Sequence, residues 1–176
     1  MNTRPPLPGD KARVSVQVGV SPADAFAVFT EEIDLWWRRG LRFRASGRSV
    51  GTLVLEAGAG GRLFERFDAA GTGQIVEVGR IVTWEPPSRL VFEWRNLSFA
   101  PHEKTEVEVR FDPTEGGTLV TVEHRGWAAL RGDHPARHGL EGPAFSRMIG
   151  LWWGDLMTAL REHVAQFGES RGGQQR

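Results

Sequence analysis

The sequence contains no cysteine, and this absence excludes disulfide bonds, thiolate nucleophiles and cysteine-ligated metal sites. The composition therefore gives no sign of an oxidising compartment, and we expect a cytoplasmic protein. Tyrosine is also absent, whereas there are seven tryptophans and ten phenylalanines. Such aromatic side chains offer large contact areas without phenolic donors, which favours packing over proton transfer.

No sign of charge is in excess, and no long apolar run is present. Acidic and basic residues number 22 each and form no block of one sign, so we expect no nucleic-acid partner. No apolar run approaches the roughly 20 residues that span a bilayer, so no membrane insertion is expected. These two absences favour a soluble protein and argue against a DNA-binding regulator.

The length of 176 residues fits one domain that can bury a core without covalent crosslinks. Residues 1–11 are proline-rich and are predicted to form a disordered leader, not a signal peptide. Residues 169–176 are polar and glycine-rich and are predicted to form a disordered tail. The folded domain is therefore expected at residues 12–168.

The folded part is predicted to begin with one strand and two short helices. From Val14 to Val20, valine alternates with small or polar residues at the period of two that is typical of a half-buried strand. Ser21 and Pro22 then indicate a helix start, as N-cap and first helical residue. We expect this helix to break near Thr30 into two short pieces.

From Val50 onward the pattern predicts six further strands, mostly antiparallel, so that the total is seven. Runs of β-branched and aromatic residues alternate with turn residues such as Pro86-Pro87-Ser88. The runs are Thr52 to Glu56, Arg62 to Phe67, a run ending at Trp84, Leu90 to Trp94, Thr105 to Phe111 and Leu119 to Glu123.

The last predicted element is a long helix that begins at Gly142-Pro143 and runs until Gly168. One apolar stripe comprises Phe145, Ile149, Trp152, Leu156, Ala159, His163 and Phe167. The neighbours Trp153, Met157, Leu160 and Val164 widen this face beyond what a surface helix needs. Two adjacent indoles point about 100° apart, so both face inward only if the helix is gripped on more than one side.

Several motifs, in this order, resemble the START-like superfamily, also called helix-grip or SRPBCC. They are Ala25-Phe26 with Phe29, Trp36-Trp37, Gly60-Gly61, Gly79 through Trp84-Glu85-Pro86-Pro87, Arg89 to Trp94, Gly117 to His124, and Trp152-Trp153 with Leu156 and Leu160. The chain is most similar to the bacterial homologues of the activator of heat-shock protein 90 ATPase. The resemblance spans roughly Val14 to Phe167.

The resemblance implies an α+β helix-grip fold, in which a curved antiparallel seven-stranded sheet wraps around the long C-terminal helix. It also implies an elongated cavity between sheet and helix that binds hydrophobic molecules in relatives. It implies no catalytic set, because the superfamily includes cyclases, carriers, receptors and co-chaperones. The leading hypothesis is therefore non-enzymatic binding of a small hydrophobic ligand.

Two alternatives stay open. One is an enzyme of the polyketide cyclase or dehydratase kind, with His124 or Glu65 as general base. The other is a co-chaperone that activates an ATPase, although nothing in the sequence supports a chaperone partner. The oligomeric state, including a homodimer, is also open.

The expected ligand contacts are the residues that the predicted strand faces and helix stripe direct inward. They are Trp36, Trp37, Phe92, Trp94, His124, Trp152 and Leu156. His124 ends a strand in which Val120 and Val122 share its face, so its imidazole is expected at the cavity mouth. A hydrogen-bonded structural histidine is the commoner outcome at such a position, and the same holds for His163 on the helix stripe.

No metal and no cofactor is expected. His134 and His138 are four residues apart beside Asp133 and Glu141, but Pro135 interrupts the pair, and a solvated loop explains both histidines. The glycines at 58–61 precede a strand and not a helix, so they do not form a phosphate-binding loop. No motif of a known catalytic set is present.

Overall fold

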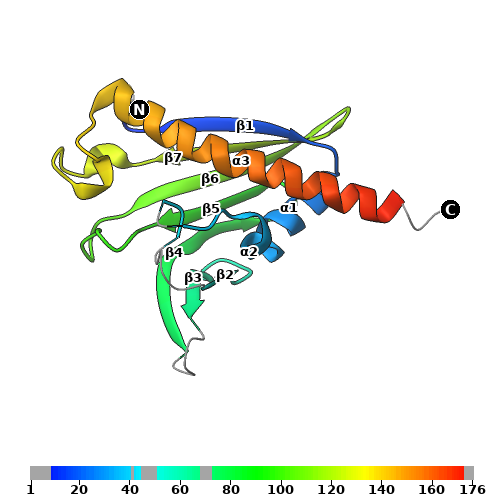
Figure 1. Cartoon of the computed structure of the whole chain (residues 1–176), viewed down its shortest axis with the longest axis horizontal. Coiled ribbons are helices and arrows are strands. Elements are labelled where there is room, and N and C mark those ends of the chain that lie inside the picture. The colour runs from blue at the N-terminus through cyan, green and yellow to red at the C-terminus, as the bar shows by residue number, and fades with distance from the viewer. Residues whose placement is uncertain (1–8, 41, 45–50, 68–72, 173–176) are drawn as a thin grey trace.

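The computed structural model describes residues 9–40, 42–44, 51–67 and 73–172, with the backbone alone described for residues 167–172. It has an α+β helix-grip fold, in which a curled seven-stranded sheet faces one long helix that crosses it (Figure 1). The elements are β1 (Ala12–Val18), α1 (Pro22–Glu31), α2 (Ile33–Trp36), β2 (Thr52–Leu55), β3 (Arg62–Phe67), β4 (Gln74–Glu85), β5 (Arg89–Trp94), β6 (Thr105–Thr114), β7 (Gly117–Arg125), the 3₁₀ turns η2 (Trp127–Ala129) and η3 (Pro135–Arg137), and α3 (Gly142–Gly172). The predicted fold class and strand number are confirmed.

The two short helices form as their sequence predicts. Ser21 is the N-cap of α1, and its Oγ accepts a hydrogen bond from the N–H of Asp24 at 3.2 Å. This bond satisfies one of the donors that a helix N-terminus leaves without an intrahelical partner. Between α1 and α2 the helix is interrupted at Glu32, two residues from the predicted break.

The sheet has the strand order β1-β7-β6-β5-β4-β3-β2, and every neighbouring pair is antiparallel. The long strand β4 pairs with β3 through its first part and with β5 through its last part. Gly79 lies where the pairing changes, and a Cβ atom built there would be 1.7 Å from the carbonyl oxygen of Glu93. No other residue type allows the two backbones to approach so closely.

The core lies between the inner face of the sheet and α3. On β6 the inward residues Val107, Val109 and Phe111 are fully buried, as the alternation of this strand predicts. On α3 the buried residues are Phe145, Ile149, Trp153, Leu156, Met157, Leu160 and Val164. Trp152, Ala159 and His163 of the predicted stripe are only half-buried, so the buried face is rotated toward the neighbours that were expected to widen it.

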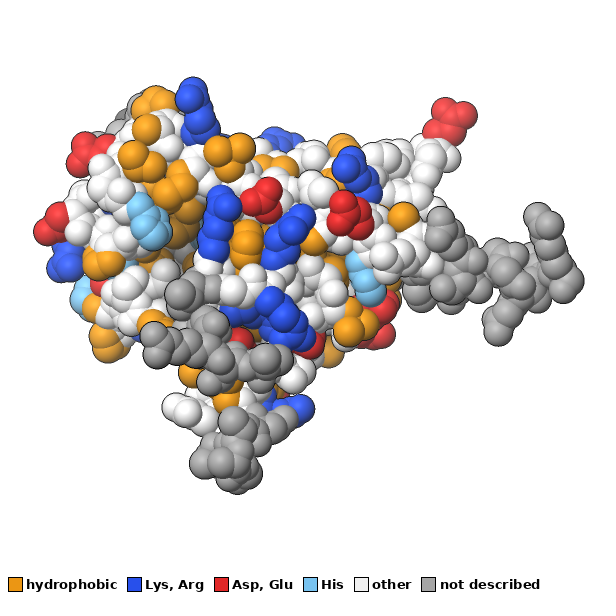
Figure 2. All heavy atoms as spheres, viewed as in Figure 1, with side chains coloured by type: hydrophobic (Ala, Val, Ile, Leu, Met, Phe, Trp, Pro, Cys, Tyr) orange, Lys and Arg blue, Asp and Glu red, His pale blue; other side chains and the backbone are white. Residues whose placement is uncertain are grey.

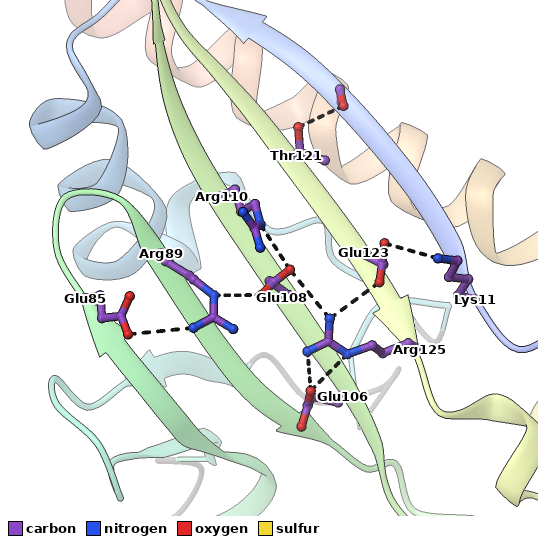
Figure 3. Close-up of polar contacts among 10 residues, drawn as sticks. Lys11, Glu85, Arg89, Glu106, Glu108, Arg110, Thr121, Glu123 and Arg125 are labelled. Atoms are coloured by element: carbon purple, nitrogen blue, oxygen red, sulfur yellow. Dashed lines mark hydrogen bonds and ion pairs between the residues drawn. The ribbon is translucent and has the colours of Figure 1, made fainter. Parts of the chain in front are cut away.

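The outward face of the sheet carries a network of charges across β5, β6 and β7, on the side turned away from α3 (Figure 3). Glu108 is its centre, with oxygens 2.7 Å from Arg89 Nε and 3.1 Å from Arg110 Nε. Burial alone would raise the pKa of Glu108, but the hydrogen bonds from these arginines hold this pKa below its usual value. The alternation of charged residues and valines along β6 therefore gives this strand an apolar face toward the core and a charged face on the outside.

Next to both expected ends of the domain, the structure describes residues that were assigned to the leader or the tail. Asp10 of the predicted leader is tied to η2, because its carbonyl oxygen accepts from Trp127 N–H and its Oδ1 accepts from Ala128 N–H. The helix α3 continues past Gly168 to Gly172. Residues 1–8 of the predicted leader and 173–176 of the predicted tail lie outside the described residues.

Among the residues described, no helix is both long and apolar enough to cross a membrane.

Candidate functional site

A cavity of about 500 Å³ lies where β2 to β5, the η3 loop and the N-terminal half of α3 meet. Its apolar lining consists of Trp37, Phe43, Leu53, Val76, Val78, Trp94, Leu97, Trp127, Ala136, Met148, Ile149 and Trp152. Its polar lining consists of Arg42, Arg44, Glu65, Glu77, Arg95, Asn96, His124 and His138. The space-filling view shows hydrophobic side chains gathered over the N-terminal part of α3, and basic and acidic side chains next to one another over its middle (Figure 2).

Indole and phenyl rings that contact one another form one wall of the cavity. Trp37 stacks on Trp94, with ring centroids 5.8 Å apart and planes inclined by 25°. Trp152 meets both of these rings edge-on, at centroid distances of 5.9 Å and 5.7 Å, and stacks on Phe43. Offset and edge-on arrangements are the favourable geometries of aromatic pairs, so this wall is held in place by its own contacts.

Two indole N–H groups of this wall are bonded to backbone carbonyl oxygens. Trp37 Nε1 donates to the carbonyl oxygen of Phe43 at 3.0 Å, and Trp152 Nε1 donates to that of Arg42 at 2.7 Å. Both acceptors belong to the short segment 42–44. The two tryptophans therefore hold this segment against the cavity and present their ring surfaces to it.

Arg44 and Asp34 also hold the segment 42–44 in place. Arg44 is buried, and its guanidinium donates to Asp34 Oδ1 at 2.7 Å and to the carbonyl oxygens of Asp34, Trp37 and Arg38. Asp34 Oδ1 also accepts from the N–H of Leu53 on the edge strand β2 at 2.8 Å. Burial acts to raise the pKa of Asp34, but the hydrogen bonds from Leu53 and Arg44 lower it below its usual value.

His124 lies fully buried at the base of the cavity, not at its mouth as the sequence predicts. Its Nδ1 accepts from Trp153 Nε1–H at 3.0 Å, so the neutral ring carries its proton on Nε2 and donates it to Thr105 Oγ1 at 2.7 Å. Thr105 Oγ1 in turn donates to the carbonyl oxygen of Trp94. Burial lowers the pKa of His124 to about 3, so the ring is neutral and both of its nitrogens are used within the protein.

Four of the seven predicted ligand contacts line the cavity, and three do not. Trp37, Trp94, His124 and Trp152 are lining residues. Trp36, Phe92 and Leu156 are buried in the solid core instead. Trp36 donates to the carbonyl oxygen of Phe29 and packs on its ring. Contact of any of these residues with a ligand stays a prediction.

Sequence reasoning missed the lining residues that come from irregular segments. Trp127 follows β7 in the η2 turn, is 3% exposed, and contacts the rings of His124 and Phe145. Phe43 and Ala136 likewise belong to loops that have no periodic pattern. Ile149 lies on the predicted helix stripe but was not among the expected ligand contacts, and the structure places it at the cavity.

Two of the other histidines, His134 and His163, form hydrogen bonds within the protein. His134 is buried and its Nδ1 accepts from Ala136 N–H at 3.1 Å, while Nε2 lies 3.4 Å from Glu103 Oε1. His138 is exposed and ends η3. His163 is half-buried at the edge of α3, 3.1 Å from Glu32 Oε1. Within the described ranges no group of three metal-ligating side chains occurs.

Three solved structures share this fold at low sequence identity. A protein from Cytophaga hutchinsonii has a TM-score of 0.63 and 12% identity, over 90% of this chain and 96% of its own. An Hsp90 activator from Plasmodium falciparum has a TM-score of 0.59 and 16% identity, over 89% and 96%. DynU16, a protein of the dynemicin biosynthetic locus, has a TM-score of 0.57 and 18% identity, over 89% of this chain and 47% of its own.

A family model also matches the sequence. No curated protein sequence matches the chain. The model described as activator of Hsp90 ATPase homolog 1-like protein matches residues 19–143, which run from the end of β1 to the start of α3. The match covers most of the chain, and the chain belongs to this family of START-like proteins.

Proposed function

We propose that this protein binds a small hydrophobic ligand, without catalysis, in the cavity between the sheet and α3. Membership of a START-like family supports a binding role in general. The observation that carries the proposal is the cavity itself, whose volume of about 500 Å³ lies within the range of about 300–1,000 Å³ that is usual for ligand pockets.

The chemistry of the wall supports an apolar and flat ligand. Trp37, Trp94, Trp127 and Trp152 all contribute to the lining, and each ring face offers a large apolar contact area. The indole N–H groups of Trp37 and Trp152 are used in bonds to carbonyl oxygens, whereas the buried Nε1 of Trp127 has no hydrogen-bond partner among the described residues. Polycyclic aromatic molecules match such a wall best.

Two substitutions on α3 test the proposal as a matched pair. Ile149 lines the cavity, whereas Leu156, two turns further along the same helix, is fully buried and does not. We expect Ile149→Trp to fill the cavity and abolish binding of 1-methylpyrene. Quenching of tryptophan fluorescence measures this binding. We expect Leu156→Trp to retain binding but to lose about 1–3 kcal/mol of unfolding free energy, because it overpacks a filled core.

The reverse result would count against the proposal. If neither the wild-type protein nor Leu156→Trp gives saturable binding to 1-methylpyrene, or if Ile149→Trp binds as well as the wild type, the cavity is not a binding site. Far-UV circular dichroism of each variant controls for loss of folding.

A cyclase-like or dehydratase-like enzyme is the second candidate, and the position of Glu65 favours it. Glu65 lines the cavity and is 2% exposed, so its carboxyl group is within reach of a bound molecule. His124 fits the role of general base poorly, because its lowered pKa makes it a weak base and both nitrogens are engaged. Turnover that is lost in Glu65→Gln but retained in His124→Gln would support this reading.

Activation of an ATPase is the third candidate. It rests on the description of the family and on the Plasmodium falciparum protein, which is described as an Hsp90 activator. At 16% identity, the structural similarity to that protein supports a common fold and does not by itself support a common activity. An ATPase assay of a bacterial Hsp90 with and without this protein tests the activity directly.

A further inference from the structure

We propose that the buried indole N–H of Trp127 selects ligands that carry a neutral carbonyl oxygen on an aromatic body, such as ketones and quinones. This inference rests on the proposed function, because it assigns the polar chemistry of the ligand in the same cavity. It goes further by naming the donor that recognises the ligand and the functional group that this donor binds.

The indole N–H of Trp127 lacks an acceptor within the protein. Trp127 is 3% exposed and lines the cavity, and its Nε1 atom is buried without a hydrogen-bond partner among the described residues. A buried indole N–H normally has a partner, because water no longer supplies one. No other described residue of the cavity lining has a buried side-chain nitrogen or oxygen atom without a partner.

The rings around Trp127 do not supply the acceptor. Phe145 and Phe99 meet the indole edge-on, at centroid distances of 5.0 Å and 6.2 Å, and a phenyl ring carries no nitrogen or oxygen. His124 lies at 4.7 Å, but both of its ring nitrogens already have partners within the protein. Trp127 also borders the cavity, so a molecule bound there is a source of the acceptor that these rings do not provide.

The other indoles of the protein indicate which acceptor fits. Trp36, Trp37 and Trp152 donate to backbone carbonyl oxygens at 3.2 Å, 3.0 Å and 2.7 Å. A carbonyl oxygen of a ligand gives Trp127 a bond of the same kind. A ketone or a quinone carries this oxygen on a flat aromatic body, which suits the aromatic wall of the cavity.

The charges of the lining favour a neutral acceptor over a carboxylate. A carboxylate loses its hydration on burial and needs cations or several donors in compensation. The guanidinium groups of Arg42 and Arg44 already pair with aspartates. The carboxyl groups of Glu65 and Glu77 also line the cavity, and they disfavour a further negative charge nearby. A neutral carbonyl group meets neither difficulty.

Two probes of the same shape isolate the carbonyl group: 1-acetylpyrene and 1-isopropenylpyrene, in which a CH₂ group replaces the ketone oxygen. Quenching of tryptophan fluorescence gives both affinities for the wild type and for Trp127→Phe, which keeps an aromatic ring without the N–H. The hydration of each free probe is the same for both proteins, so the change in the affinity ratio reports the bond to Trp127. An unmade hydrogen bond of a buried donor lowers affinity about fivefold to a hundredfold. We therefore expect the preference for the ketone to fall at least about fivefold in Trp127→Phe.

Trp84→Phe is the matched control. Trp84 is half-buried, packs edge-on against Phe26 and lies outside the cavity lining, so this variant should keep the wild-type ratio. The indole N–H signal of Trp127 in the NMR spectrum of the wild type is a second readout. The ketone should move this signal downfield relative to 1-isopropenylpyrene, because the two probes have the same pyrene ring and only the ketone accepts a hydrogen bond. This readout decides the question if Trp127→Phe does not fold.

The outcomes separate the two proposals. If both probes bind but their affinity ratio is the same in the wild type and Trp127→Phe, or if the Trp127 signal responds equally to both probes, the role of Trp127 is refuted and the binding cavity stands. If 1-pyrenecarboxylate binds more tightly than 1-acetylpyrene at pH 7.5, the preference for a neutral acceptor is refuted. If none of these probes binds to the wild-type protein, both proposals fail.

Discussion

His124 belongs to a residue type that is common in functional sites, but in this protein it has a structural role. The chain of bonds from Trp153 through His124 and Thr105 to the carbonyl oxygen of Trp94 links α3 to β7, β6 and β5. A buried polar group is tolerated when each of its donors and acceptors is paired, and here all of them are. The imidazole thus connects the helix to the sheet.

The pKa of His124 predicts how stability depends on pH. Burial lowers this pKa to about 3, whereas the unfolded value is about 6.5, so only the unfolded chain binds this proton between the two values. The free energy of unfolding should therefore fall as pH drops below 6.5, with a slope that approaches about 1.4 kcal/mol per pH unit. Above pH 6.5 His124 is neutral in both states and contributes no slope.

Urea unfolding at pH 7.0, 6.0 and 5.0 measures this effect. His124→Gln keeps one acceptor and one donor but does not titrate, so its unfolding free energy should change less between pH 6 and 5 than that of the wild type. The carboxyl groups of Asp34 and Glu108 have lowered pKa values, and they lose their stabilisation only at lower pH. Equal slopes in wild type and variant would contradict the assignment.

At the scale of the element, α3 is the helix whose burial holds the domain together. It packs against β1 and contacts α1 and α2, and its buried residues recur at helical spacing along one wide face. Leu156 is 0% exposed and Leu151 is 62% exposed on the same helix. The two leucines therefore offer the same substitution in opposite environments.

We expect Leu156→Asp to lower the free energy of unfolding by several kcal/mol, because it removes buried apolar surface and places a carboxyl group in the apolar core without a charged or hydrogen-bonding partner. Leu151→Asp should change the same quantity by no more than about 0.5 kcal/mol. Urea unfolding at pH 7 measures both. A loss below about 1 kcal/mol in Leu156→Asp would show that the helix is not packed on the sheet.

At the scale of the whole molecule, the cavity is a space between elements and belongs to none of them. Its walls come from β2 to β5, the segment 42–44, the loop around η3 and α3. A ligand there contacts elements that are far apart in the chain. Its binding free energy therefore adds to the stability of the whole fold, because the unfolded chain has no such site.

A saturating apolar ligand should consequently raise the midpoint of thermal unfolding. At a free concentration of about 100 times the Kd, the stabilisation is about 2.7 kcal/mol, which corresponds to about 5–10 °C for a chain of this size. Differential scanning calorimetry with 1-methylpyrene measures the shift, and Ile149→Trp is the control that should show none. An equal shift in wild type and variant would place the ligand elsewhere.

The sequence by itself determined the element types, and its ordered motifs indicated the fold class by resemblance. Alternation in Thr105 to Phe111, the turn at Pro86-Pro87-Ser88 and the N-cap Ser21 are local signals, and each appears in the structure where it is expected. The wide apolar face of α3 also follows from the sequence, since its period of 3.6 residues is a property of the chain. Each of these features depends on residues that are close in sequence, so the sequence alone is enough to predict it.

Only the tertiary structure decided which inward residues line the cavity. Trp36 and Trp37 are adjacent in sequence and both are buried, yet one packs on Phe29 and the other faces the cavity. Ile149 and Leu156 lie on one helix face, yet the sheet fills the space beside Leu156 and leaves it open beside Ile149. The reason is physical: a cavity forms where side chains from distant elements do not fill the space between them, and that distance depends on packing rather than on local sequence.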